Sequence, residues 1–287
     1  MEVFKRSFRL KIQIGNVLKT YQELSFTDQS LKIEFDITMG VAGAMANGNI
    51  TVYGLNNQDM EYLASCYNPI KGVFKRNFVS LEVGYIDKLG LILKGNILEV
   101  EPDFNTLGNK ISLRVMAGIQ NNLLNNNITT SLANKVDFKT ICQECAKNND
   151  MPLKFDSKIA KRFLTDYSFN GTPFQQINNL RKYYDDLDIF VDGIKNVLNV
   201  LKKEGGEVIN KNVLSKQTGL IGKPTPVSNG LKVLSLLNTN FYAGGQVQLK
   251  NEHLKSFDGT YKIWELKHFG TNIGDNWNSE LILQKLK

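Results

Sequence analysis

Apolar and polar side chains alternate through most of the first 133 residues. Phe8, Leu10, Ile12 and Ile14 are separated by charged or polar neighbours, and positions 31–37 repeat the pattern. A period of two is typical of strands that bury one face, so we expect an antiparallel sandwich or barrel. Further strands are expected at residues 49–53, 79–85, 91–100 and 110–116.

One helical pattern interrupts this alternation. Between residues 57 and 67, Met60, Leu63, Ala64 and Tyr67 recur at spacings of three and four, which places them on one face of a helix. Pro69 lies just beyond, where proline is common after a helix ends. We therefore expect a single helix within this β-rich region.

The period changes between residues 134 and 202, which predicts two helices. Asp137 can cap the first one, because its carboxylate can accept from the free amides of the first turn. Thr172 and Pro173 form a favourable N-cap and first position for the second. The apolar face of the first helix comprises Phe138, Ile141, Cys142, Cys145 and Ala146. That of the second comprises Phe174, Ile177, Leu180 and Tyr184.

Two strands are expected after these helices, at residues 188–191 and 196–201. Asp192 and Gly193 lie between them and predict a tight hairpin, because both residue types tolerate positive φ. The middle region is therefore expected to be a small α+β module.

The last region opens with the polar stretch KKEGGEVINKN, at 202–212, which predicts a loop or linker, and then returns to strand patterns. We expect an N-terminal β domain over residues 1–133, an α+β domain over 134–202 and a C-terminal β domain over 203–287. An open barrel exposes unpaired backbone groups at its edges, so subunit contacts along those edges are expected. The strand patterns of the last region lie at 233–237, 246–250, 261–268 and 280–286.

Composition is that of a folded protein. Of 287 residues, 42% are hydrophobic and 22% are charged. No apolar run reaches the roughly 18 to 20 residues of a membrane helix, and the first ten residues lack the apolar block of a signal peptide. We therefore expect no membrane insertion, and synthesis and retention in a cytoplasm.

The formal net charge of +7 raises the question of an acidic partner. Lys and Arg exceed Asp and Glu by 14 to 12 over residues 1–135, 10 to 9 over 136–202 and 11 to 7 over 203–287. The densest basic group, Lys158, Lys161 and Arg162, lies beside Asp156 and Asp166. Because the excess is diffuse, we expect no sequence-specific binding of nucleic acid.

The cysteines predict neither a disulfide framework nor a metal site. Cys142 and Cys145 have the C-x-x-C spacing of zinc sites, but both lie on the apolar face of a predicted helix. Two further ligands would be needed, and His253 and His268 are isolated in different strand patterns. We expect buried thiols and no cofactor.

No catalytic arrangement is evident either. Neither histidine lies in a nucleophile motif such as G-x-S-x-G. Asp185, Asp186 and Asp188 could supply paired carboxylates for glycoside hydrolysis, but their position between a helix and a strand predicts a solvated turn. The sequence is therefore predicted not to encode an enzyme.

Glycines and tryptophans also have simpler interpretations than ligand binding. Gly219, Gly222 and Gly230 lack the G-K-[ST] or G-x-G-x-x-G spacing of phosphate loops and predict turns. Pro224 and Pro226 enforce extended backbone, as in an ordered crossing loop. Trp264 and Trp277 could stack on bases or sugars, but a core or rim position is favoured.

Several segments together resemble the baseplate hub proteins of tailed phages. The segment TGLIGKPTPVSNGLKVLSLL and the later DGTYKIWELKHFG look like the family's C-terminal signature, and MANGNITVYGLN looks like an upstream strand in which Gly54 replaces a usual Asn. VSLEVGY and ILKGNILEVEPD resemble paired strands, and YSFNGTPFQQINNL the helix of an inserted domain. The matching positions are Asn47, Ile50, Val52, Tyr53, Leu55, Gly84, Tyr85, Gly95, Gly219, Leu220, Ile221, Gly222, Pro224, Gly245, Gly259, Tyr261, His268, Gly270 and Trp277.

This resemblance implies a mainly β fold with an α+β insert and two tail-tube-like barrel or sandwich domains. It implies a homotrimeric ring in the virion's tail baseplate, assembled in the host cytoplasm, that joins the hexameric tail tube to the trimeric central spike and leaves a lumen for DNA. The implied partners are the tail tube or distal tube protein, the spike, the tape measure protein and the baseplate wedge proteins.

Three alternatives remain open from the sequence. The chain could be the hub of a tailocin or a secretion machine, which shares the fold. It could also be a glycan-binding or glycan-cleaving module. A β barrel that binds single-stranded nucleic acid would need a basic stripe, which the sequence does not show.

Overall fold

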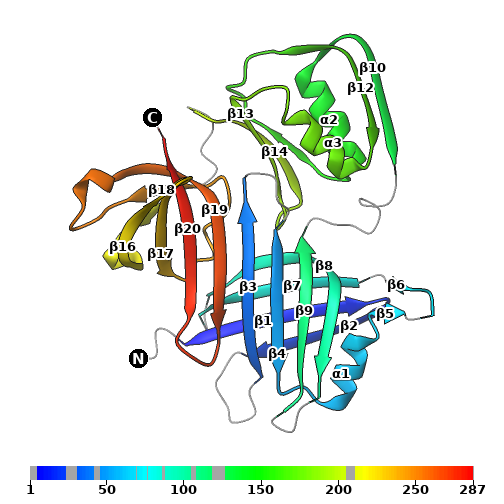
Figure 1. The fold of residues 1–287 in the computed structure, drawn as a ribbon, viewed down its shortest axis with the longest axis vertical. Helices are drawn as coiled ribbons and strands as arrows, with labels where there is room; N and C mark the ends of the chain where they lie inside the picture. The colour runs from blue at the N-terminus through cyan, green and yellow to red at the C-terminus, as the bar shows by residue number, and fades with distance from the viewer. Residues whose placement is uncertain are drawn as a thin grey trace.

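The computed structural model describes residues 5–23, 31–41, 46–68, 70–75, 77–85, 88–104, 108–117, 127–204 and 211–286. Strands dominate, and three α-helices are present in these ranges (Figure 1). The helices are α1 (Asn57–Ala64), α2 (Phe138–Asn148) and α3 (Pro173–Leu180). Among the described residues, none of the helices is long and apolar enough to cross a membrane.

The strands divide into three groups along the chain. Those before the helical region are β1 (Arg6–Ile14), β2 (Val17–Glu23), β3 (Lys32–Gly40), β4 (Asn47–Tyr53), β5 (Tyr67–Asn68), β6 (Val73–Phe74), β7 (Asn77–Tyr85), β8 (Lys88–Asp103) and β9 (Lys110–Ala117). The middle group is β10 (Ile128–Asp137), β11 (Leu153–Phe155), β12 (Phe163–Gly171), β13 (Leu187–Asp192) and β14 (Val197–Lys202). The last group is β15 (Lys211–Leu214), β16 (Leu220–Val227), β17 (Gly230–Leu236), β18 (Gln246–Leu249), β19 (Gly259–Thr271) and β20 (Trp277–Lys285).

Among the described residues, β5 and β6 pair only with each other, and the other strands of the first and last groups form one 13-stranded sheet. This sheet, here called the main sheet, runs β16-β17-β20-β19-β3-β4-β9-β8-β7-β1-β2. A side branch carries β18 and β15, and β15 pairs with β18 in parallel. The other neighbouring strands are antiparallel, including β3 and β19, which join the two ends of the chain. The expected mainly β fold with an α+β insert is therefore confirmed. The domain boundaries at 133 and 202 stay predictions.

Alternation of side chains produces the core of the main sheet. On β1, Phe8, Leu10, Ile12 and Ile14 are all buried, as their spacing predicts. The same core includes residues from both ends of the chain, such as Trp277, whose ring meets Phe35 edge-on at a centroid distance of 5.1 Å. One hydrophobic core therefore fastens the first and last strand groups together.

The middle group forms the α+β insert. Helices α2 and α3 lie between the two-stranded sheet β10-β12 and the three-stranded sheet β11-β14-β13 (Figure 1). Both predicted caps are confirmed: Asp137 accepts from Lys139 N at 3.1 Å, and Thr172 and Gln175 form a capping box. The predicted α2 face is buried in full, whereas Gln176 rather than Phe174 is buried on α3.

Several local predictions were wrong. Helix α1 ends at Ala64, and Tyr67 lies exposed in the short strand β5. The β13–β14 hairpin has a four-residue turn in which Asn196, not Gly193, adopts positive φ. Pro224 and Pro226 lie in strand β16 rather than in a crossing loop, because extended backbone also suits an edge strand. Strands β2, β5, β6, β10, β11, β12, β15 and β16 were not predicted.

Two side chains near opposite ends of the chain fix the turn between β19 and β20. The Arg6 guanidinium donates to the carbonyls of Thr271 and Asp275, both at 2.9 Å, and also to that of Gly274. Asn272 accepts from Ile33 N at 2.8 Å through its side-chain oxygen. No sequence pattern marked Arg6 or Asn272, because their partners are backbone groups more than 230 residues away in the chain.

Candidate functional site

The outer face of seven adjacent strands, β17-β20-β19-β3-β4-β9-β8, forms a polar surface that spans both ends of the chain. Register sets its composition. Asp36 of β3 lies opposite Phe269 of β19 and Asn49 of β4, and Asn49 lies opposite Arg114 of β9. Because side chains alternate between the two faces of a strand, Asp36, Asn49 and Arg114 point outward while their chain neighbours fill the core. Phe269 is the apolar residue in this outward row. We call this surface the ion-pair face.

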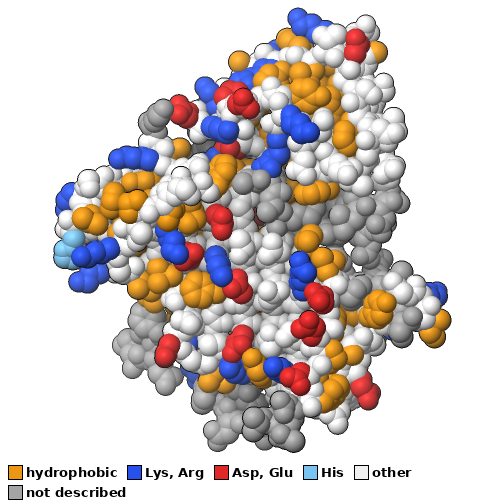
Figure 2. Space-filling model, in the orientation of Figure 1, with side chains coloured by type: hydrophobic (Ala, Val, Ile, Leu, Met, Phe, Trp, Pro, Cys, Tyr) orange, Lys and Arg blue, Asp and Glu red, His pale blue; other side chains and the backbone are white. Residues whose placement is uncertain are grey.

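Five ion pairs lie on the ion-pair face, and they join acids and bases on the same or neighbouring strands. Figure 2 shows basic and acidic side chains next to one another across this view. The pairs are Lys32–Glu34 at 2.6 Å, Lys267–Asp36 at 2.7 Å, Lys232–Glu280 at 2.9 Å, Lys110–Asp103 at 3.2 Å and Arg114–Glu99 at 3.6 Å. Exposed pairs of this kind contribute little stability, so their consequence is a neutralised surface.

The charge of the ion-pair face differs in sign from that of the whole chain, which is +7. Seven acidic and six basic side chains point outward from these strands. Lys32 lowers the pKa of Glu34 through a hydrogen bond, and the Tyr53 hydroxyl donates to the same carboxylate at 2.8 Å. The acids are Glu34, Asp36, Glu99, Glu101, Asp103, Glu265 and Glu280, and the bases are Lys32, Lys94, Lys110, Arg114, Lys232 and Lys267.

The family-motif positions are distributed over the main sheet rather than gathered in one cleft. Their functional roles stay predictions. The positions lie in β4 (Asn47, Ile50, Val52, Tyr53), just after it (Leu55), in β7 (Gly84, Tyr85), in β8 (Gly95), before and in β16 (Gly219, Leu220, Ile221, Gly222, Pro224), before β18 (Gly245), in β19 (Gly259, Tyr261, His268, Gly270) and in β20 (Trp277).

Two motif glycines allow close approach of backbone. A Cβ at Gly84 would lie 2.0 Å from the Lys88 carbonyl oxygen, and one at Gly270 would lie 2.7 Å from that of Asn276. Gly219 instead has a φ of 102° and ends the short 3₁₀ helix at Lys216–Thr218. These positions therefore serve the turns and crossings of the main sheet.

His268 and Ser279 form a pair that the sequence did not reveal, because they lie on adjacent strands. The His268 Nδ1 and Ser279 Oγ atoms are 2.8 Å apart. Both side chains are fully buried, and burial lowers the pKa of His268 to about 4. A nucleophile must reach its substrate, so this pair is a structural contact of the core.

The three carboxylates that could have formed a hydrolase site are engaged differently. Asp186 is bound by the Arg162 guanidinium, with one contact at 2.6 Å, and that hydrogen bond lowers the pKa of Asp186. Asp188 is buried and forms an ion pair with Lys262 of β19. The expected solvated turn therefore holds for Asp185 and Asp186 but was wrong for Asp188.

The Lys262–Asp188 pair belongs to a junction between the insert and the main sheet. Burial lowers the pKa of Lys262 to about 8. The Arg181 guanidinium donates to the carbonyls of Ile189, at 2.7 Å, and Val41, and so links α3, β13 and the end of β3. A small apolar cluster completes the junction and comprises Val41, Phe190, Leu201, Ala243 and Trp264.

The remaining candidates for ligand chemistry are internal or structural. Cys142 and Cys145 are buried free thiols whose pKa values burial raises, and no group of three metal-ligating residues occurs in the described ranges. Trp277 is buried, and Trp264 is half-buried in the junction. Neither tryptophan offers the exposed ring that base or sugar stacking needs.

Comparison with known families identifies the chain. The model of the family described as "Baseplate hub gp41" matches residues 10–276. The chain belongs to this baseplate hub family. The resemblance read from the sequence motifs is therefore confirmed, and membership implies a component of the virion tail. No curated protein matches the chain.

Solved structures share the fold of this hub. A tail protein from Neisseria meningitidis MC58 matches with a TM-score of 0.62 at 8% identity, covering 97% of this chain and 96% of that one. The 43 kDa tail protein of prophage MuSo2 from Shewanella oneidensis matches with 0.61 at 10% identity, covering 96% of both. The E. coli c3393 protein, described as a type VI secretion component similar to T4 tail proteins gp27 and gp5, matches with 0.63 at 9%, covering 96% and 77%.

Proposed function

We propose that this hub forms a homotrimeric ring that joins the hexameric tail tube to the trimeric central spike, and that the ion-pair face lines its lumen. The observation that carries the proposal is the charge of that face. It has one more acid than it has bases, and five of its six cations are paired with acids, on a chain of net charge +7. DNA binds surfaces whose free cations replace its counterions. A neutralised lining would let DNA pass without being held.

The proposed role is structural rather than enzymatic. Asp186, Asp188, the thiols and the His268–Ser279 pair are each bound or buried within the fold, and Asp185 lies in an exposed turn. The proposed partners are the tail tube or distal tube protein, the spike, the tape measure protein and the wedge proteins, with assembly in the host cytoplasm. Likeness to phage tail proteins supports this set.

A second candidate is the hub of a tailocin or secretion machine. The similarity to the E. coli type VI secretion component and to a chain of a PdpA–VgrG complex favours it. In that case the same ring would belong to an injection machine rather than to a virion.

Mass measurement by light scattering tests the ring. The purified chain would be measured at several concentrations, alone and with the tube and spike proteins encoded beside it. We expect a threefold mass, either alone or with these partners. A monomeric mass that changes with neither the tube protein nor the spike protein would contradict the proposal.

Charge reversal tests the lining. Replacing Glu99, Glu101 and Asp103 by Lys places three cations on the ion-pair face, and we expect tails that assemble but deliver DNA more slowly. The purified variant should also retain DNA at low salt and release it as salt rises. Lysine substitutions at the exposed Asp150 and Asp185 of the insert provide the control, with unchanged delivery expected.

A further inference from the structure

The main sheet ends in three strands, and two of these ends are closed by the chain itself. On β15, the Thr218 hydroxyl donates to the Val213 carbonyl at 2.8 Å, which occupies the outward edge. On β16, Val227 and Gly230 are the closing pair of a two-residue turn. The backbone of Pro226 therefore points away from β17, and proline carries no N–H with which to bind another strand.

The β16 edge is irregular as well. Its pairing with β17 shifts register between Ile221 and Thr225, and the extra residues include Pro224. Bulges and prolines are devices by which natural proteins prevent strands from adding to an exposed edge. This end of the main sheet is closed to strand addition.

The third end, β2, has no such device. Ile14 and Val17 close the two-residue turn between β1 and β2, so Val17, Lys19 and Tyr21 direct their backbone groups toward β1. The alternate residues Leu18, Thr20 and Gln22 direct theirs outward, and these have no backbone partner among the described residues. A row of outward backbone N–H and C=O groups of this kind is complementary to another extended strand.

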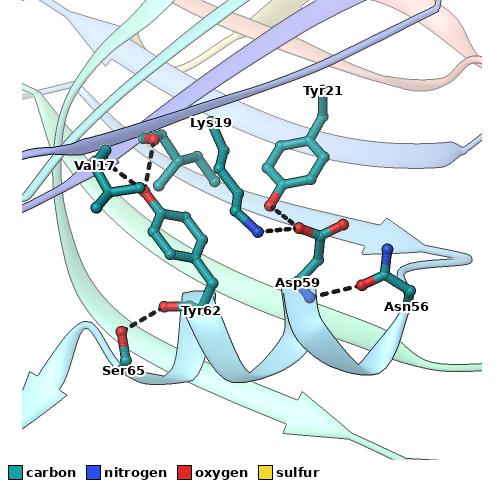
Figure 3. Close-up of polar contacts among 8 residues, drawn as sticks. Val17, Lys19, Tyr21, Asn56, Asp59, Tyr62 and Ser65 are labelled. Atoms are coloured by element: carbon teal, nitrogen blue, oxygen red, sulfur yellow. Dashed lines mark hydrogen bonds and ion pairs between the residues drawn. The ribbon is translucent and has the colours of Figure 1, made fainter.

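Helix α1 holds this edge strand in place (Figure 3). The Lys19 ammonium is 2.6 Å from the Asp59 carboxylate, which also accepts from the Tyr21 hydroxyl at 3.2 Å. The Tyr62 hydroxyl donates to the Val17 carbonyl at 2.9 Å. Lysine on an edge strand usually deters pairing, but Lys19 is drawn down onto α1 and leaves the edge uncovered. The strand is preorganised, which lowers the entropic cost of adding a partner.

We propose that β2 is a strand-acceptor site, to which an extended segment of a different tail protein adds in the assembled baseplate. This rests on the proposed ring. A second copy cannot supply β15 or β16, whose edges are closed, and pairing of β2 with β2 creates a twofold dimer that a threefold ring does not contain. Val17 and Leu18 are 53% and 58% exposed, and they offer apolar contacts to the added strand.

Amide hydrogen exchange tests the proposal in the protein as it occurs. Exchange over residues 17–23 would be compared between the purified chain and the chain in purified tails. We expect the outward amides of Leu18, Thr20 and Gln22 to slow at least tenfold in tails, because a ladder bond protects each one. Unchanged exchange in tails that contain the chain overturns the acceptor site alone, whereas absence of the chain from tails overturns the proposed function.

A matched pair of variants separates strand addition from other kinds of burial. Thr20→Pro removes one outward N–H, and Thr20→Val keeps it with a similar side-chain volume. Both should fold, as checked by thermal unfolding, and only Thr20→Pro should fail to enter tails. Equal incorporation of both variants overturns the proposal. A twofold mass for the purified chain, lost in Thr20→Pro, assigns the edge to a second copy and also overturns it.

Discussion

Charged side chains play opposite parts in two regions of this hub. On the ion-pair face, the side chains of Lys267 and Asp36 are 37% and 48% exposed, and water screens their attraction. At the junction with the insert, those of Lys262 and Asp188 are 10% and 3% exposed. Removing two charges from water is costly, so each depends on the other. Exposed pairs set the charge of a surface, whereas the buried pair fixes how two parts of the chain meet.

Breaking the buried pair should have the largest effect. Lys262→Ala leaves Asp188 buried without a counter-charge, and we expect a loss of about 4 kcal/mol in unfolding free energy. Denaturant unfolding measures it. The double variant Lys262→Met with Asp188→Leu should recover most of the loss, because apolar residues of similar size remove both charges. A Lys262→Ala variant as stable as wild type would contradict the burial of the Lys262–Asp188 pair.

The buried His268 extends the comparison to pH. Its pKa is about 4 in the folded chain and the ordinary value is 6.5, so the unfolded chain binds the proton first as pH falls. The contribution of neutral His268 to the free energy of unfolding is complete above pH 6.5 and is lost as the pH falls toward 4. The loss amounts to about 3 kcal/mol. Unfolding at several pH values should show this loss in wild type and a flatter profile in His268→Gln. Parallel profiles of stability against pH in wild type and His268→Gln would contradict the lowered pKa of His268.

The half-buried cluster of Lys19, Tyr21 and Asp59 under β2 should have an effect between those of the buried and the exposed ion pairs. Asp59→Asn removes the charge that binds Lys19 and accepts from Tyr21. We expect a loss of about 1 kcal/mol by denaturant unfolding, since one charge-assisted hydrogen bond is weakened while the side chain keeps its shape. Asn56→Gly serves as the comparison, because it removes the α1 cap but no contact with β2.

The exposed pairs should show the smallest effect. Asp36→Asn and Lys267→Met, measured singly and together, should give a coupling of less than about 1 kcal/mol that disappears at high salt. A larger coupling that persists in salt would mean that the ion-pair face is covered in the isolated chain.

The sequence alone determined which residues face inward. Alternation identified β1, β3, β4, β7, β8 and β9, and helical spacing with capping residues identified α2 and α3. These are local signals, because a side chain's periodicity and a cap depend on residues a few positions apart. Strands β10 and β12 lacked such a signal, since much of each faces water and their alternation is weak.

Only the tertiary structure decided what lies beside what. The burial of Asp188, the contact of His268 with Ser279 and the attachment of the last turn by Arg6 each join residues far apart in the chain. The open edge of β2 and the closed edges of β15 and β16 likewise follow from strand order. Periodicity tells each residue which way to face, but the partner it meets is set by how the strands pair, and that depends on the packing of the whole core.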